Sequence, residues 1–139
     1  MSATPMESFH EFLPEWEELL SVSPVDSLYL TPQWQQVWWD NFGDGRKMAG
    51  YYMRDAGALM AVASLSRQGD EVTFTGGPET FDYNDFLIRP GYETVFFSKL
   101  LRSLEADRVK RMTLYSLMET SPTLTHLPEQ ARSQGYRVE

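Results

Sequence analysis

The 139-residue sequence contains no cysteine. This absence excludes a disulfide framework, a thiolate metal site and a cysteine nucleophile, and it makes the reducing cytoplasm the expected compartment. Long apolar runs are also missing, because no uninterrupted stretch approaches the roughly 20 residues that cross a bilayer. The N-terminal segment has neither the basic start nor the apolar stretch of a signal peptide. We therefore expect a soluble, cytoplasmic protein with no membrane insertion.

Basic residues are scarce: 12 Lys and Arg stand against 20 Asp and Glu, for a net charge of −8. Such a balance excludes a general affinity for nucleic-acid phosphate or an anionic membrane surface. Residues 1–45 contain the whole acidic excess, since they include no Lys or Arg, whereas residues 46–139 hold both signs equally. The solvated outer faces of two helices account for this distribution, and an acidic surface for a basic partner is the alternative.

The remaining composition, 42% apolar and 23% charged, is that of a globular chain, and its length suits one domain spanning residues 1–139. Apolar residues at helical spacing predict a first helix within residues 9–20. Its start has two interpretations. Ser8 and Glu11 have the spacing of a capping box, whereas Pro14 suits the first position of a shorter helix.

A second helix is predicted from the capping residue Thr31 to Gly43, with Pro32 in its first turn. Its expected buried stripe consists of Trp34, Val37 and Trp38. A third helix is expected to follow Pro90 and Gly91, and a short fourth helix is expected to end at Gly135.

Short apolar runs bounded by turn-forming residues predict strands. They cover residues 48–53, 58–66, 71–75, 84–89 and 111–116, with a break at 76–78, and residues 136–138 have the pattern of the start of another strand. Hairpin-length turns between the first three runs predict an antiparallel meander. Strands in succession, followed by helices alternating with strands, are typical of an α+β domain. We therefore expect a mixed α/β fold with a largely antiparallel sheet flanked by helices, and the unfinished strand suggests that the sheet is incomplete at that end.

Motifs of common catalytic sites are absent, including phosphate-binding and dinucleotide-binding glycine loops, HExxH, GxSxG and an EF-hand loop. The two histidines, His10 and His126, have no second imidazole or carboxylate at metal-ligand spacing. No catalytic residue and no metal ligand is therefore assigned.

The densest group of polar and aromatic residues is at positions 81–86. Asp82, Tyr83 and Asp85 offer carboxylates for an amine or hydroxyl and a flat ring for stacking, so they are candidate substrate-binding residues. Strand alternation would place Asp82 and Asp85 on opposite faces. The alternative is a turn in which Asp and Asn cap backbone amides while Tyr83 covers the core.

Three strings in order, residues 30–47, 74–90 and 121–139, resemble the N-terminal half of the CelD-like, FemAB-related acetyltransferases with the GNAT fold. The resemblance implies two GNAT-like domains in tandem, of which the C-terminal one binds the acyl donor and the N-terminal one shapes the acceptor cleft. Asp82, Tyr83 and Asp85 would face that cleft, with Tyr115 and Arg46 as further substrate-binding candidates. Such proteins often open with a short strand, and the first nine residues do not have a strand pattern.

The donor loop of a GNAT domain, Q/R-x-x-G-x-G/A, holds the pyrophosphate of acetyl-CoA on backbone amides before a helix. At that position this sequence has Pro90, which lacks an amide donor, and a single glycine. We therefore expect this chain alone to bind no cofactor, with acetyl-CoA held by a partner domain.

The leading hypothesis is the non-catalytic, acceptor-cleft half of a tandem GNAT acyltransferase. Its partner would be a C-terminal GNAT domain or a second copy, and its ligand a small-molecule, sugar or amine acceptor. A self-standing acidic interaction module is one alternative. An active acetyl-CoA-dependent N-acetyltransferase completed by dimerisation is the other, and the sheet edge near residues 136–138 is where a further strand would add.

Overall fold

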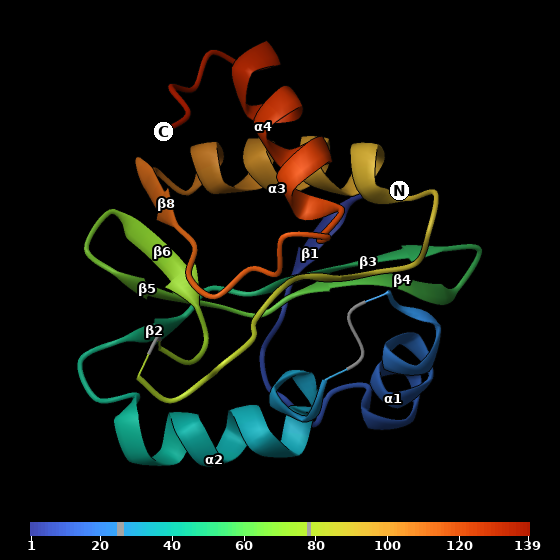
Figure 1. Ribbon diagram of the computed structural model, residues 1–139, viewed down its shortest axis with the longest axis vertical. Helices are drawn as coiled ribbons and strands as arrows, with labels where there is room; N and C mark the ends of the chain where they lie inside the picture. Colours follow the sequence, from blue (N-terminus) through green and yellow to red (C-terminus); the bar gives the residue numbers. More distant parts are fainter. Residues whose placement is uncertain (25–26, 78) are drawn as a thin grey trace.

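The computed structural model describes residues 1–24, 27–77 and 79–139. Asp26, from the acidic first third, and Pro78, from the predicted break, lie outside these residues. The chain forms three layers, with strands in the middle and helices on both sides (Figure 1). The helices are α1 (Leu13–Val22) and α2 (Pro32–Phe42) on one side, and α3 (Glu93–Ala106) and α4 (Thr123–Ser133) on the other. The expected α+β class is confirmed.

Helix α1 begins at Leu13, with Pro14 in its first turn, so the shorter of the two predicted helices is the one that forms. The side chain of Glu11 accepts a hydrogen bond from the Glu7 amide at 2.9 Å and does not form a capping box with Ser8. Trp16 is buried and donates its indole N–H to the Leu30 carbonyl at 2.9 Å. This bond ties α1 to the short 3-10 turn η1 (Leu28–Leu30), which leads into α2.

Helix α2 has the predicted ends, because the Thr31 side chain accepts a hydrogen bond from the Trp34 amide and the helix stops before Gly43. Its predicted buried stripe is confirmed at Trp38 and wrong at the other two positions. Trp34 and Val37 are exposed, while Gln35, Trp38 and the partly buried Trp39 face the protein. The reason is that residues 35, 38 and 39 share a helical stripe just as well, and tertiary packing selects that stripe.

The predicted meander is confirmed, but two of its strands are each divided into two. Register pairs Met48 with Ser66 and Tyr51 with Ala63, so the first two strands form one long hairpin with an interruption near Gly50. A Cβ atom at Gly50 would lie 2.7 Å from the Ala63 carbonyl oxygen, so only glycine fits this crossing. The resulting strands are β2 (Lys47–Met48), β3 (Tyr51–Asp55), β4 (Ala58–Ala63), β5 (Leu65–Gln68) and β6 (Glu71–Phe74).

Two sheets result, with strand orders β1-β3-β4-β7 and β2-β5-β6-β8. All pairs are antiparallel except β6 with β8. The remaining strands are β1 (Ala3–Pro5), β7 (Leu87–Ile88) and β8 (Arg111–Thr113). The last two are shorter than the predicted strands 84–89 and 111–116, because the residues beside them form loops.

Both ends of the chain differ from expectation. The N-terminus does form a strand, β1, antiparallel to β3, and the Met6 amide continues this pairing to the Gly50 carbonyl at 2.8 Å. A three-residue edge strand ending in proline has no recognisable pattern, so pairing decides its structure. The strand predicted at 136–138 is absent, and Tyr136 and Val138 pack as an irregular tail against the core. As predicted, α4 closes at Gly135, which has a φ of +91°.

Apolar side chains form two cores, one on each side of the strands. The larger core lies under α3 and α4 and includes the fully buried Phe96, Phe97 and Leu100. The smaller core lies over α1 and includes Phe9 and Trp16. Within the described ranges, none of the helices combines the length and apolar character needed to cross a membrane.

Candidate functional site

The polar and aromatic group at 81–86 lies on a loop that leaves the sheet and returns to it. Phe74 of β6 pairs with Leu65, and continuing that register would place Gly77 opposite Val62. Leu87 occupies that position instead, so ten additional residues lie between β6 and β7. We call residues 76–77 and 79–86 the excursion loop. It runs between the strands and the α2 side of the molecule (Figure 1).

Hydrogen bonds and a close contact at a glycine hold the base of the excursion loop in place. Gly76 has a φ of +107°, and a Cβ atom there would lie 2.8 Å from the ring of Phe81. The buried side-chain amide of Asn84 donates to the Thr75 carbonyl at 2.9 Å. The Asn84 backbone amide donates to the Ser116 carbonyl at 3.1 Å. These contacts place the loop against the segment that follows β8.

Asp85 is turned inward, and only 6% of it is exposed. Its carboxylate accepts hydrogen bonds from the Thr123 hydroxyl at 2.6 Å, from the Ser121 hydroxyl, and from the Phe86 amide at 2.8 Å. Burial raises its pKa above the ordinary value, and these three hydrogen bonds oppose the increase. Asp85 therefore anchors the loop to the start of α4 and is not accessible to a substrate. For this residue the structure matches the alternative of a capping turn.

Asp82 faces outward and contacts a residue 53 positions earlier in the sequence. The Tyr29 hydroxyl of η1 donates to its carboxylate at 2.8 Å, and this hydrogen bond raises the pKa of Tyr29. The Tyr29 ring lies 5.4 Å from that of Phe81 and 5.5 Å, edge to face, from that of Trp34. We call this group of Tyr29, Trp34, Phe81 and Asp82 the Tyr29–Asp82 face.

Tyr83 adjoins this face, and Tyr115 lies on a segment that contacts the excursion loop. Tyr83 follows Asp82 directly and is 50% exposed. Tyr115 is also exposed and precedes Ser116, whose backbone carbonyl receives the Asn84 amide. The structure therefore places Asp82, Tyr83 and Tyr115 on neighbouring segments, as the sequence analysis grouped them.

Arg46 lies apart from them. It follows the far end of α2, with its guanidinium 5.8 Å from the centre of the Trp38 ring. Trp38 is buried one turn along α2 from Trp34, so Arg46 contacts a ring outside the Tyr29–Asp82 face. We leave Arg46 out of the candidate site for this reason.

The sequence analysis missed Tyr29 and Trp34. Tyr29 stands 53 positions before Asp82, and no local pattern connects the two. Trp34 was assigned to the buried stripe of α2. One signal in the sequence could have pointed to them. Both residues lie within three positions of the predicted helix cap at Thr31, and a cap fixes the direction of the backbone around it.

The chemistry of the Tyr29–Asp82 face is that of a cation or polyol site. Its carboxylate is exposed, and the three ion pairs found among the described residues use other carboxylates. Aromatic rings attract a cation through their negative faces and stack on sugar rings or other apolar surfaces. An ammonium group beside Asp82 would combine both attractions.

The start of α3 is the position at which a pyrophosphate loop was considered. The Gly91 amide donates to the Glu93 carboxylate at 2.9 Å, and the Tyr92 amide donates to the Arg89 carbonyl at 3.1 Å. Pro90 has no amide hydrogen. The positive end of the α3 dipole is therefore already matched by the carboxylate of Glu93. An anion placed there would meet like charge.

Across the described ranges, no group of three or more His, Asp or Glu side chains is arranged to hold a metal ion. Comparisons with protein-family models, with curated proteins and with solved structures gave no match.

Proposed function

We propose that this chain is a GNAT-like domain that contributes an acceptor-binding surface to an acyltransferase and leaves binding of the acyl donor to a partner domain. The observation that carries the proposal is the Tyr29–Asp82 face. It joins η1 and the excursion loop, and it presents the partly exposed Tyr29 ring and the exposed Trp34 ring beside one exposed carboxylate, with Phe81 buried against Tyr29. That chemistry suits an amine or amino-sugar acceptor.

The N-terminal strand supports the proposal, although the sequence did not predict that strand. Relatives with the resemblance described above often begin with a short strand, and β1 provides one. The elements occur in the order strand, two helices, antiparallel meander, helix, parallel strand and helix. This order is compatible with the expected GNAT-like domain.

The start of α3 supports the proposal that a partner domain binds the acyl donor. Donor binding on backbone amides requires free N–H groups that point at the pyrophosphate. Here Glu93 already accepts the Gly91 hydrogen bond, and Pro90 supplies none. The two remaining hypotheses gain no comparable observation. In particular, Glu15 and Glu18 of the acidic first third pair with Arg54 and Arg89 of the same chain, which reduces the acidity available to a basic partner.

Calorimetric titration with D-glucosamine, N-acetylglucosamine and acetyl-CoA tests the proposal. Glucosamine carries an ammonium group, whereas N-acetylglucosamine keeps the ring and lacks the charge. We expect glucosamine to bind more tightly and acetyl-CoA not to bind at millimolar concentration. Asp82→Asn, which keeps the side-chain shape, should weaken glucosamine binding roughly three- to tenfold and remove the preference over N-acetylglucosamine.

Asp44→Asn is the matched control, since Asp44 is exposed beyond the far end of α2. It should leave glucosamine binding unchanged. Equal binding of the two sugars by the parent protein would overturn the role of Asp82. Saturable binding of acetyl-CoA would overturn the assignment of donor binding to a partner domain.

A further inference from the structure

The second sheet ends at β8, and within the described residues no strand pairs with its outer side. The Arg111 amide donates to the Asp70 carbonyl, toward β6. Because backbone groups alternate in direction along a strand, the N–H and C=O of Met112 point to the outer side. An unpaired strand edge of this kind is a template for one more strand.

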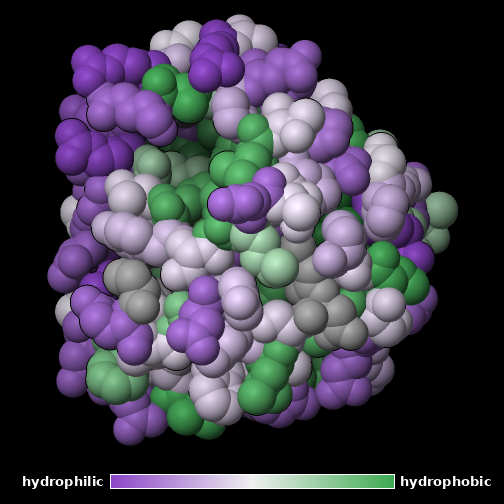
Figure 2. Space-filling view, in the orientation of Figure 1, coloured by the Kyte–Doolittle hydropathy of each residue, from purple (hydrophilic) through white to green (hydrophobic). Residues whose placement is uncertain are grey.

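An open groove of about 870 Å³ runs beside this edge. Its walls come from α3, β8, α4 and the C-terminal tail, and Figure 2 shows apolar side chains around a hollow between the tail and α4. Much of the lining is apolar: Leu104, Met112, Leu114, Leu124, Leu127 and Val138. The side chains of Met112 and Leu114 alternate with those of the neighbouring β8 residues and project on the α3 side of the sheet.

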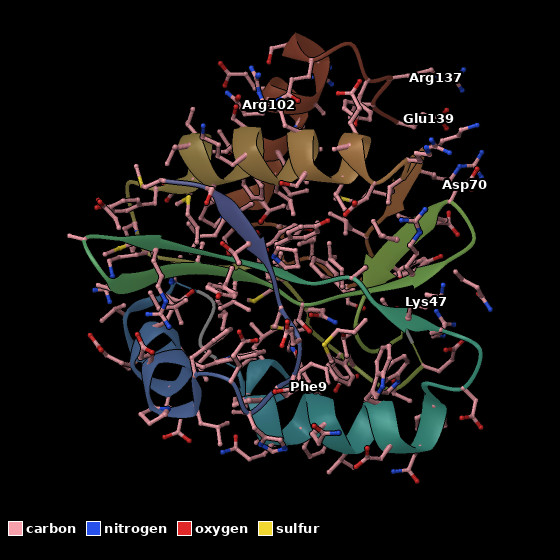
Figure 3. The ribbon with its side chains drawn as sticks, turned by 180° about the vertical axis from the view of Figure 1, so that it is seen from behind. Phe9, Lys47, Asp70, Arg102, Arg137 and Glu139 are labelled. Carbon is pink, nitrogen blue, oxygen red and sulfur yellow. The ribbon has the colours of Figure 1, made fainter. Side chains whose placement is uncertain are left out.

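Basic residues border the groove, although the chain as a whole has a negative net charge. Lys110, Arg111 and Arg137 line it, and Glu139 is the single carboxylate in the lining. Glu139 pairs with Arg137 on the tail, where Figure 3 shows both side chains. Lys110 and Arg111 form none of the ion pairs found in the described residues. They are thus available to carboxylates of an occupant.

The edge strands of a second copy of this chain do not carry such carboxylates. The other edge strands of the two sheets are β1, β7 and β2, with sequences ATP, LI and KM. None contains an acidic residue, and β2 adds Lys47 beside Arg46. Pairing β8 with another β8 would also bring basic residues together. Charge complementarity therefore favours a different chain.

We propose that the groove beside β8 binds an extended segment of a partner protein, which adds as a strand to β8. The segment would carry apolar side chains at alternate positions, for the walls of the groove, and carboxylates at its ends, for Lys110 and Arg111. Main-chain hydrogen bonds to Met112 supply affinity, and the alternate side chains supply specificity, as in other strand-addition complexes. This inference is independent of acyl transfer.

The test uses two labelled ten-residue peptides and fluorescence anisotropy. The first has valine at alternate positions and two glutamates at each end. The second is the same peptide with prolines at its two central positions, which cannot donate to a ladder. We expect the first to bind and the second not to bind. Saturating peptide should also slow hydrogen exchange of the Met112 amide, measured by NMR.

Matched variants locate the binding. Leu124 lines the groove and is 48% exposed, so Leu124→Glu places a charge in the groove without disturbing the core. It should weaken binding at least about tenfold, because an unpaired charge is costly beside apolar surface. Leu28→Glu, at a residue 62% exposed on η1, is the control and should change nothing.

Charge reversal at the rim gives the second comparison. Lys110→Glu should weaken the acidic peptide roughly three- to tenfold, and the loss should shrink at high salt. Lys47→Glu, on the distant edge strand β2, should have no effect (Figure 3). Equal binding of the proline peptide, or no binding of either peptide, would overturn the proposal. A dimer seen in sedimentation would also overturn the proposal if Leu124→Glu abolishes it and Leu28→Glu preserves it. Such a result would assign the groove to a second copy.

Discussion

Replacing Asp85 by alanine tests whether its carboxylate anchors the excursion loop. The exposed carboxylate of Asp82, proposed to bind a ligand, is the comparison. Asp85 accepts hydrogen bonds from Ser121, Thr123 and Phe86, and all three partners are at least nine-tenths buried. Truncation leaves three buried donors without an acceptor, at about 1–3 kcal/mol each, although the hydroxyls can rotate and a buried charge is removed. We expect Asp85→Ala to lower the free energy of unfolding by about 2–4 kcal/mol.

Urea denaturation followed by tryptophan fluorescence measures this change. Asp82→Ala is the matched control, since Asp82 is exposed and loses only its bond with Tyr29. Its unfolding midpoint should stay close to that of the parent protein. An Asp85→Ala variant within about 0.5 kcal/mol of the parent, which is the usual effect of a surface change, would refute the anchoring role.

The pH dependence of Asp85 has a definite sign. Burial raises the pKa of Asp85, so the folded protein holds this proton to higher pH than the unfolded chain does. The stability that the protonated group contributes is fully present below the unfolded pKa, and it is lost as pH rises through the raised folded pKa. Relative to Asp85→Asn, which does not titrate, the parent protein should therefore lose stability across this interval. A constant difference between the two proteins would contradict the raised pKa.

Three further substitutions test other parts of the structure, each by urea denaturation. Glu15→Gln removes a paired carboxylate with Arg54; because both side chains are about a third or more exposed, the loss at pH 7 should stay under about 1 kcal/mol. Arg54 lowers the pKa of Glu15, so this loss should vanish as pH falls through the lowered value. Gly76→Ala should cost about 2 kcal/mol through its positive φ and the contact with Phe81, and an unchanged midpoint would argue against this loop geometry. Phe97→Ala, in the larger core, should cost about 3–5 kcal/mol, and a cost below about 1 kcal/mol would contradict its burial.

The parts of the fold that the sequence predicted are those fixed by local chemistry. Thr31 sets the start of α2, because a capping hydroxyl suits only a few helix positions, whereas the sequence allowed Ser8 or Pro14 at the start of α1 and the structure selects Pro14. The meander followed from apolar runs at hairpin spacing. Gly135 ended α4 for the reason expected, a backbone conformation that glycine adopts without strain.

The remaining features depend on partners distant in sequence. Strand β1 exists because β3 offers it an edge, and the apolar pattern at 136–138 is satisfied by packing against the core. The excursion loop illustrates the same limit at the candidate site. The residues from Asp82 to Asp85 stood out as a polar group, but alternation along a strand could not show which carboxylate turns inward. The hydroxyls of Ser121 and Thr123 decide that for Asp85, and Tyr29 completes the environment of Asp82.

Asp85 also connects the two proposed binding regions. It belongs to the loop that carries Asp82, and its partners Ser121 and Thr123 stand at the start of α4. The first turns of the same helix present Leu124 and Leu127 to the groove beside β8. A strand bound in the groove would therefore contact the helix that holds Asp85. The buried carboxylate holds both regions in one arrangement, which gives it a physical role distinct from that of its exposed neighbour three residues earlier.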